Sequence, residues 1–429
     1  MTGPATGFLG LSHLGLVSSI GWASLGDPVV AVDLDGGRVA ELQRGTLPIL
    51  EPSLETLFGR SRARMTFASD PAALGECPLV IIAYDVPTDA LNRSDTAVVL
   101  DLVDAALPHL RPGVTLALMS QVPTGFTRQL ADRIRMRRPD LVFTLYYWVE
   151  TLIVGNAVAR YLTPERIMLG CRDPAAPLPR KLDAGLRRFG CPVLTMRYES
   201  AELAKTAINL YLTASVTYAN TLADLCEAVG ADWSEIVPAL RLDARIGPAA
   251  YLAPSLGVAG GNLERDLVTL HRLARELGVD AAFVDTLVDY NGRRLRWLMD
   301  RLRLHVFSAT ALPTLAVWGL TYKKNTRATR NSPALRTIAG LSGRARFRAW
   351  DPVIRAGDVD IAAEVCASRD AALDGADALL IMADWDEFAS ADVIAIQKAM
   401  RRPIVIDCVG ALRARSAELS GITYLGMGR

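Results

Sequence analysis

Short apolar runs alternate with helical patterns from about residue 5 to residue 198. Residues 28–33, 79–83 and 114–119 are apolar or β-branched at almost every position. Such continuous apolar runs are typical of parallel strands that are covered on both faces. Because helical patterns separate these runs, we predict an α/β domain built on a parallel sheet.

The strand pattern stops after residue 198, and a long helical pattern replaces it. Residues 199–230 predict one helix of about 30 residues, with apolar residues on more than one face and Gly230 at its end. We expect a helix this long and this apolar to be buried, at a boundary between domains or between subunits.

The alternation of strand and helix patterns returns from about residue 312. Further apolar runs lie at residues 314–320, 346–351, 378–382 and 403–407. Their order repeats that of the first part: a strand, a glycine-containing turn, a helix, and a strand that ends in aspartate. We therefore predict two doubly wound α/β domains joined by a helical spine. The predicted domains are residues 1–198, 199–305 and 306–429.

Composition and charge exclude several classes of function. The 429 residues are 51% hydrophobic, enough for two or three domains with cores of their own. With 47 basic and 46 acidic side chains, nothing suggests nucleic acid or an anionic membrane as a partner. Residues 1–6 lack the basic region of a signal peptide, and no apolar run reaches the roughly 20 residues that span a bilayer. The six cysteines are scattered without metal-type pairs, so we expect a soluble, cytoplasmic protein with reduced thiols and no metal site.

A glycine-rich turn follows the first predicted strand. Gly10, Ser12 and Gly15 form the pattern Gly-x-Ser-x-x-Gly, and the next strand ends in Asp33. In a Rossmann-like domain such a turn brings backbone N–H groups against a dinucleotide pyrophosphate, and the carboxylate binds the adenosine ribose. Ser12 in place of the middle glycine either weakens binding or donates a hydrogen bond to phosphate. Asp33 disfavours the 2′-phosphate of NADP while Arg38 could accept it, and we predict NAD as the cofactor.

Several motifs, in the same order along the chain, match one family. Residues 45–52 match a Gly-x-x-Pro-Ile-x-Glu-Pro element, and residues 163–170, 243–248, 319–326 and 384–388 have close counterparts. On these motifs, nearly the whole chain resembles the UDP-glucose/GDP-mannose dehydrogenase family, the nucleotide-sugar 6-dehydrogenases. The resemblance implies two Rossmann-like domains, NAD, a nucleotide-sugar substrate (a UDP-sugar first of all) and a homodimer formed through the central helix.

The resemblance also implies catalytic residues for a first oxidation. Lys205 and Asn209 stand at the positions of the family's lysine and asparagine on the long helix, and their i, i+4 spacing places both on one helical face. Asp266 stands at the family's aspartate. The base is expected to be a water held by Asp266 and Lys205, while Lys205 and Asn209 stabilise the developing alkoxide. The alternative is a solvated lysine and a capping-type asparagine.

The residues for the family's second oxidation have changed. In the glycine-rich loop at residues 257–266, the resemblance places Asn262 where the family has the cysteine that attacks the aldehyde. A carboxamide is essentially non-nucleophilic. Gln121 replaces the water-binding threonine and Val154 a second glutamate, whereas the water-orienting Glu150 is retained. One change is compatible with drift or an introduced mutation, but several changes in one half-reaction favour divergence.

The expected substrate contacts are mixed. Arg245 matches a residue that reaches the sugar-nucleotide across the dimer, and Lys323 matches another that contacts it. Val409 stands where the family has an arginine, and together with Val154 it predicts a drier pocket. The remaining candidates are Gly257 and Tyr322 for the substrate and Gln121, Arg265 and Arg330 for the cofactor.

Four functions remain open on this basis. The first is a two-electron oxidation of one alcohol, which releases an aldehyde or ketone. The second is complete oxidation to the uronate without a covalent intermediate. The third is a redox-neutral epimerase or dehydratase that uses bound NAD. The fourth is a protein that binds the nucleotide sugar or NAD without catalysis.

Overall fold

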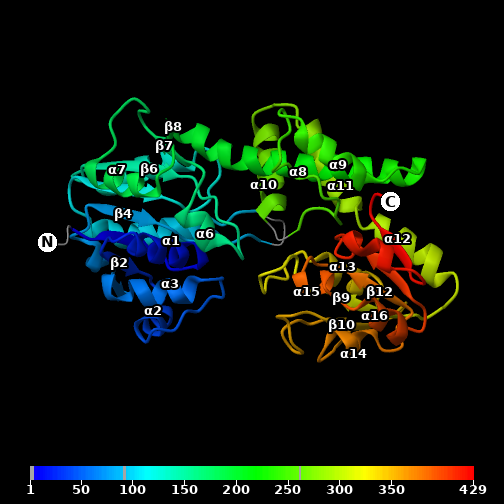
Figure 1. Cartoon of the computed structure of the whole chain (residues 1–429). Coiled ribbons are helices and arrows are strands. Elements are labelled where there is room, and N and C mark those ends of the chain that lie inside the picture. Colours follow the sequence, from blue (N-terminus) through cyan, green and yellow to red (C-terminus); the bar gives the residue numbers. More distant parts are fainter. Residues whose placement is uncertain (1–3, 90–92, 260–261) are drawn as a thin grey trace. The chain divides into compact units, whose positions relative to one another are not determined.

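The computed structural model describes residues 4–89, 93–259 and 262–429 (Figure 1). The chain divides into two compact units, residues 1–207 and 208–429. Between the end of β8 at Arg197 and the start of β9 at Thr314, the described residues contain helices and no strand. The α/β class and the helical middle are therefore confirmed. The division into three domains stays a prediction.

The first unit is built on an eight-stranded sheet with the order β3-β2-β1-β4-β5-β6-β7-β8. The strands pair in parallel except for β6 and β7, which are antiparallel. The apolar runs at residues 28–33, 79–83 and 114–119 form β2, β4 and β5, which pair in parallel as expected, and the antiparallel pair lies outside these runs. The strands are β1 (Thr6–Leu9), β2 (Val29–Val32), β3 (Met65–Ala68), β4 (Leu79–Ile82), β5 (Val114–Leu118), β6 (Phe143–Trp148), β7 (Ile167–Cys171) and β8 (Val193–Arg197).

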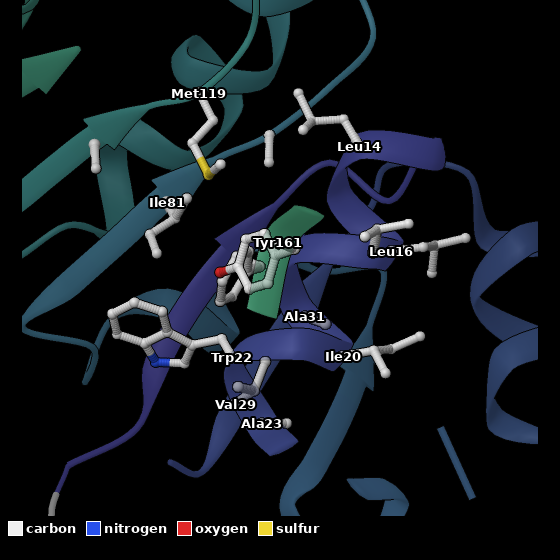
Figure 2. Close-up of a cluster of buried hydrophobic side chains, with 14 of the residues drawn as sticks. Leu14, Leu16, Ile20, Trp22, Ala23, Val29, Ala31, Ile81, Met119 and Tyr161 are labelled. Atoms are coloured by element: carbon white, nitrogen blue, oxygen red, sulfur yellow. The ribbon is translucent and has the colours of Figure 1, made fainter. Parts of the chain in front are cut away.

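Helices cover both faces of this sheet. Leu79 and Ile81 of β4 belong to the cluster that includes Trp22 and Tyr161 (Figure 2), while Val80 and Ile82 are equally buried on the opposite face. This double burial explains the continuous apolar runs. The helices are α1 (His13–Ser24), α2 (Gly36–Gln43), α3 (Leu54–Ser61), α4 (Ala97–Ala106), α5 (Phe126–Arg137), α6 (Ala157–Leu162) and α7 (Arg180–Leu186).

The second unit contains a six-stranded parallel sheet with the order β11-β10-β9-β12-β13-β14. In β9, Leu315 and Val317 face one core cluster and Ala316 and Trp318 face another, so both faces are again covered. The strands are β9 (Thr314–Trp318), β10 (Arg346–Trp350), β11 (Glu364–Val365), β12 (Ala378–Ile381), β13 (Ile404–Asp407) and β14 (Thr423–Gly426). The helices are α9 (Trp233–Leu242), α10 (Asn262–Glu276), α11 (Ala282–Arg293), α12 (Arg296–Leu302), α13 (Pro333–Gly340), α14 (Arg369–Leu373), α15 (Asp386–Ala389) and α16 (Val393–Ala399).

The long predicted helix is α8, which runs from Tyr198 to Val229 over 32 residues. We expected this helix to be buried, but in the single chain only part of its apolar surface is covered. Tyr211, Tyr218 and Leu225 are exposed by 68%, 47% and 53%, and Val229 by 76%. Ala219 and Ala223, by contrast, are buried beside Trp233. One side of the helix thus packs within the second unit and another side presents large apolar groups to solvent.

Candidate active site

Two glycines shape the turn between β1 and α1. The chain turns at Gly10 with φ of +95°, a conformation that favours glycine. A Cβ atom on Gly15 would lie 2.0 Å from the Gly10 carbonyl oxygen and 2.5 Å from that of Ala83. Only glycine therefore lets α1 approach the strands this closely. The turn also lies where the strand order reverses between β1 and β4, the point at which open α/β sheets bind ligands. This cradle fits a dinucleotide.

Asp33 braces the same turn from the end of β2. Its Oδ2 accepts hydrogen bonds from Leu11 N at 2.6 Å and from Arg38 Nη1 at 3.0 Å, and Oδ1 accepts one from Asp35 N at 2.9 Å. Burial opposes the charge of Arg38, but hydrogen bonds with Tyr84 and Asp33 raise its pKa above the ordinary value. Because Arg38 is committed to Asp33, it is a poor receptor for a 2′-phosphate. The arrangement favours NAD over NADP.

A second brace starts from His13, the first residue of α1. His13 Nε2 lies 2.9 Å from Glu51 Oε2, and the Glu51 carboxylate also accepts from Gly155 N at 3.0 Å and Ala157 N at 2.7 Å. Burial would raise the pKa of Glu51, but these bonds hold it below its usual value. The pair ties the cofactor turn to the segment after β6. Glu51 belongs to the motif at residues 45–52, but the sequence alone does not indicate this role.

Lys205 and Glu150 come together in the first unit. Lys205 Nζ lies 3.2 Å from Glu150 Oε2, and the two side chains are exposed by only 11% and 15%. Glu150 Oε1 accepts from the backbone N–H of Leu152, which fixes the carboxylate in its loop. The ammonium is therefore held in one place and is largely shielded from water, as stabilisation of a developing alkoxide requires. Gln121, after β5, is partly buried, and Val154 follows Glu150 in the same loop.

Asn209, Asp266 and Arg265 come together in the second unit. Asn209 Nδ2 donates to Asp266 Oδ2, and Arg265 Nε lies 3.3 Å from Asp266 Oδ1. All three residues are buried. Lys205 and Asn209 both lie on α8, one helical turn apart, so one helix positions both side chains. α10 begins at Asn262, whose side chain lies outside the described residues, so its predicted role stays a prediction.

The glycine-rich loop is braced by a residue that sequence reasoning missed. Gly257 has φ of +95°, and a Cβ atom there would lie 2.2 Å from Asn291 Oδ1. That oxygen accepts from Val258 N at 2.7 Å. Burial raises the pKa of Glu264, which accepts hydrogen bonds from Asn331 and Asn291. The sequence carries no signal for Asn291, because it lies within an ordinary helical pattern in α11.

The other predicted substrate and cofactor residues are more dispersed. Lys323 Nζ lies 5.4 Å from the centre of the Tyr322 ring. Arg330 is exposed. Arg245 is highly exposed, and both its Nε and its Nη2 donate to the carboxylate of Asp243. Val409 N donates to Asp407 Oδ1 at the end of β13.

The described residues contain neither a candidate membrane-spanning helix nor a group of side chains placed to hold a metal ion. None of the helices in residues 4–89, 93–259 and 262–429 is long and apolar enough to cross a membrane. Within the same residues, no group of three or more His, Cys, Asp or Glu side chains is placed to hold a metal ion. All six cysteines are free thiols.

Comparison with known proteins gives consistent matches along the chain. Three models of the UDP-glucose/GDP-mannose dehydrogenase family match: its NAD binding domain at residues 5–182, its central domain at 199–293 and its UDP binding domain at 316–414. A UDP-glucose 6-dehydrogenase of Pseudomonas aeruginosa is 31% identical, over 98% of this chain and 96% of that protein. UDP-glucose 6-dehydrogenase TuaD of Bacillus subtilis is 28% identical, over 98% and 92%.

Solved structures agree with the fold. A UDP-glucose dehydrogenase from the hyperthermophilic archaeon Pyrobaculum islandicum is similar with a TM-score of 0.85 and 25% identity, over 99% of this chain and 97% of that one. A UDP-D-ManNAc dehydrogenase from Pyrococcus horikoshii has the same TM-score at 22% identity, over 99% of both chains.

Proposed function

Because the chain belongs to the UDP-glucose/GDP-mannose dehydrogenase family of NAD-dependent oxidoreductases, we propose that it oxidises one alcohol of a UDP-sugar and stops after that step. The product is an aldehyde or a ketone, and each turnover removes two electrons. The observation that carries the proposal is a contrast among the predicted catalytic residues. The polar groups for the first oxidation are present and hydrogen-bonded, whereas Asn262 stands where the family's cysteine would be.

The first oxidation needs a proton acceptor and a positive charge near the reacting oxygen. Asp266 is buried against Asn209 and Arg265, so it can hold a water that takes the hydroxyl proton. Lys205, held by Glu150, can stabilise the alkoxide as its negative charge develops. NAD, when bound, supplies the hydride acceptor, and the turn of Gly10, Ser12 and Gly15 with Asp33 would hold it.

The second oxidation by the family's covalent route needs a thiolate that attacks the aldehyde. A carboxamide at position 262 cannot form a thioester. Glu150, which would orient the hydrolytic water, serves as the partner of Lys205 in this structure. Its retention therefore does not require a second oxidation. By the family pattern alone, Val154 and Val409 each stand where a charged residue is expected, which favours a substrate with fewer charged contacts.

The proposal predicts one NADH per product molecule. Purified protein with NAD would be incubated with a panel of UDP-sugars, and NADH would be measured by absorbance and products by mass spectrometry. We expect an aldehyde or ketone, trapped by a hydrazine, in a one-to-one ratio with NADH. Two NADH per molecule together with a uronate would contradict the proposal. Product without net NADH would point instead to a redox-neutral reaction, and binding without turnover to a non-catalytic protein.

We also propose that the protein is a homodimer through α8. Tyr211, Tyr218 and Leu225 are exposed and follow one another at seven-residue spacing, which places them along one side of the helix. A row of large apolar side chains in water is unfavourable for a monomer and is typical of a helix that pairs with another copy.

Replacement of Leu225 by arginine is expected to break this dimer, because it buries a charge in the apolar row. Light scattering after gel filtration should give twice the 46.3 kDa chain mass for the unchanged protein and a single chain mass for Leu225→Arg. Met136, 76% exposed on α5, provides a matched control, and Met136→Arg should leave the dimer intact. A monomeric unchanged protein, or a Leu225→Arg protein that remains dimeric, would refute the idea.

A further inference from the structure

We propose that the carboxylate of Asp85 occupies the phosphate seat of the cofactor site, so that this chain binds NAD more weakly than it would without that negative charge. The phosphate seat is defined here as the backbone N–H groups at the start of α1, around Ser12 to Leu14. The inference concerns cofactor binding alone and does not depend on which oxidation follows.

Two hydrogen bonds place Asp85 at this seat. Leu14 N donates to Asp85 Oδ2 at 2.9 Å, and Asp85 N donates to Ser12 Oγ at 2.8 Å. The first bond uses an N–H of the opening turn of α1, the kind of group that a dinucleotide turn offers to pyrophosphate. The second uses the hydroxyl that stands in place of the middle glycine. The Ser12 hydroxyl oxygen therefore accepts a hydrogen bond from the protein backbone, while its O–H can still donate, so the predicted role of Ser12 as a donor to phosphate stays a prediction.

The segment that carries Asp85 is held firmly. It follows β4 directly, and Tyr84 N donates to Ser120 Oγ at 2.9 Å. Tyr84 also fills the space beside Gly10, where a Cβ atom would lie 2.9 Å from the tyrosine ring. Since β4 is the neighbour of β1 at the reversal of strand order, this segment borders the ligand crevice. The carboxylate is thus part of the crevice wall.

A carboxylate and a pyrophosphate compete for the same seat. The partial positive charge at a helix N-terminus stabilises either anion, and two anions in one place repel each other. His13, the first residue of α1, is already paired with Glu51. Burial lowers the pKa of His13, but this hydrogen bond and the charges of Asp85, Glu51 and Glu150 together raise it above its ordinary value. Asp85 is thus one of three carboxylates around this imidazole. NAD must move the Asp85 carboxylate away before its phosphates reach Leu14 N.

The test is a comparison of ligand affinities in Asp85→Asn. Asparagine keeps the size and the hydrogen-bonding oxygen while it removes the charge. By isothermal titration calorimetry we expect the Kd for NAD to fall about tenfold, and the Kd for ADP-ribose to fall similarly. Adenosine, which lacks the phosphates, should bind equally to both proteins. Glu76→Gln removes the same charge from an exposed site paired with Arg111 and should change none of these values.

Several outcomes would overturn the proposal. An unchanged Kd for NAD in Asp85→Asn would do so, as would an equal gain for adenosine, which would indicate a general change in the pocket. Absence of NAD binding by both proteins would also contradict it. Ser12→Ala provides a second variant in case Asp85→Asn folds poorly. It removes the acceptor of Asp85 N, loosens the carboxylate and should also tighten NAD binding.

Discussion

Replacement of Lys205 by methionine is expected to lower kcat by about 10³-fold. Methionine fills much of the space of the lysine stem, so the packing of α8 should survive while the ammonium is lost. The effect should be large because the Lys205 ammonium is shielded from water. Glu150, which is itself fixed by the backbone of Leu152, holds that ammonium in position. The rate would be measured as NADH formation at saturating NAD and substrate, with the UDP-sugar that the unchanged protein oxidises fastest.

The control for this change is another lysine on a helix. Lys398 is exposed on α16, and Lys398→Met should leave kcat within a factor of about two. The Kd for NAD, measured by calorimetry, should remain close to the unchanged value in Lys205→Met, which separates loss of chemistry from loss of cofactor. A Lys205→Met protein that keeps more than a tenth of its activity would show that the lysine is structural.

Much of the fold follows from local patterns that the sequence shows directly. The apolar runs at residues 79–83 and 314–320 mark β4 and β9 because strands buried on both faces leave no polar positions. The predicted run at residues 314–320 extends two residues past the end of β9 at Trp318, because its apolar residues continue into the turn that follows the strand. The antiparallel pairing of β6 and β7 was missed because strand direction depends on the path of the connecting segment, and an apolar run carries no direction.

The site was predictable where its residues are close in sequence. Lys205 and Asn209 share a helical face through their spacing alone. The partners were not predictable in this way, because Lys205 meets Glu150 across 55 residues and Leu14 meets Asp85 across 71. Such contacts depend on the order of strands in the sheet. Both proposals rest on such contacts: we propose that the first supports the reaction and that the second opposes binding of the cofactor.

Replacement of Gly15 by alanine is expected to destabilise the first unit by about 3 kcal/mol or more and to abolish measurable NAD binding. The added Cβ would press on two backbone carbonyl oxygens, those of Gly10 and Ala83, which cannot move as a flexible side chain can. α1 would have to shift away from the sheet, and its N-terminus would leave the cofactor crevice. Thermal unfolding would report the stability, and calorimetry the Kd for NAD.

Gly59→Ala is the matched control for this substitution. Gly59 lies on the exposed side of α3, whose other side is buried through Leu54 and Phe58, and a Cβ atom at Gly59 would meet nothing within 4 Å. Alanine at position 59 should therefore stabilise the protein by about 0.5–1 kcal/mol, because it restricts the unfolded chain and favours the helix. The two substitutions are chemically identical, so their opposite effects would isolate the close approach of α1 to β1 and β4. A Gly15→Ala protein with unchanged stability and NAD affinity would show that the glycine is not needed for this approach.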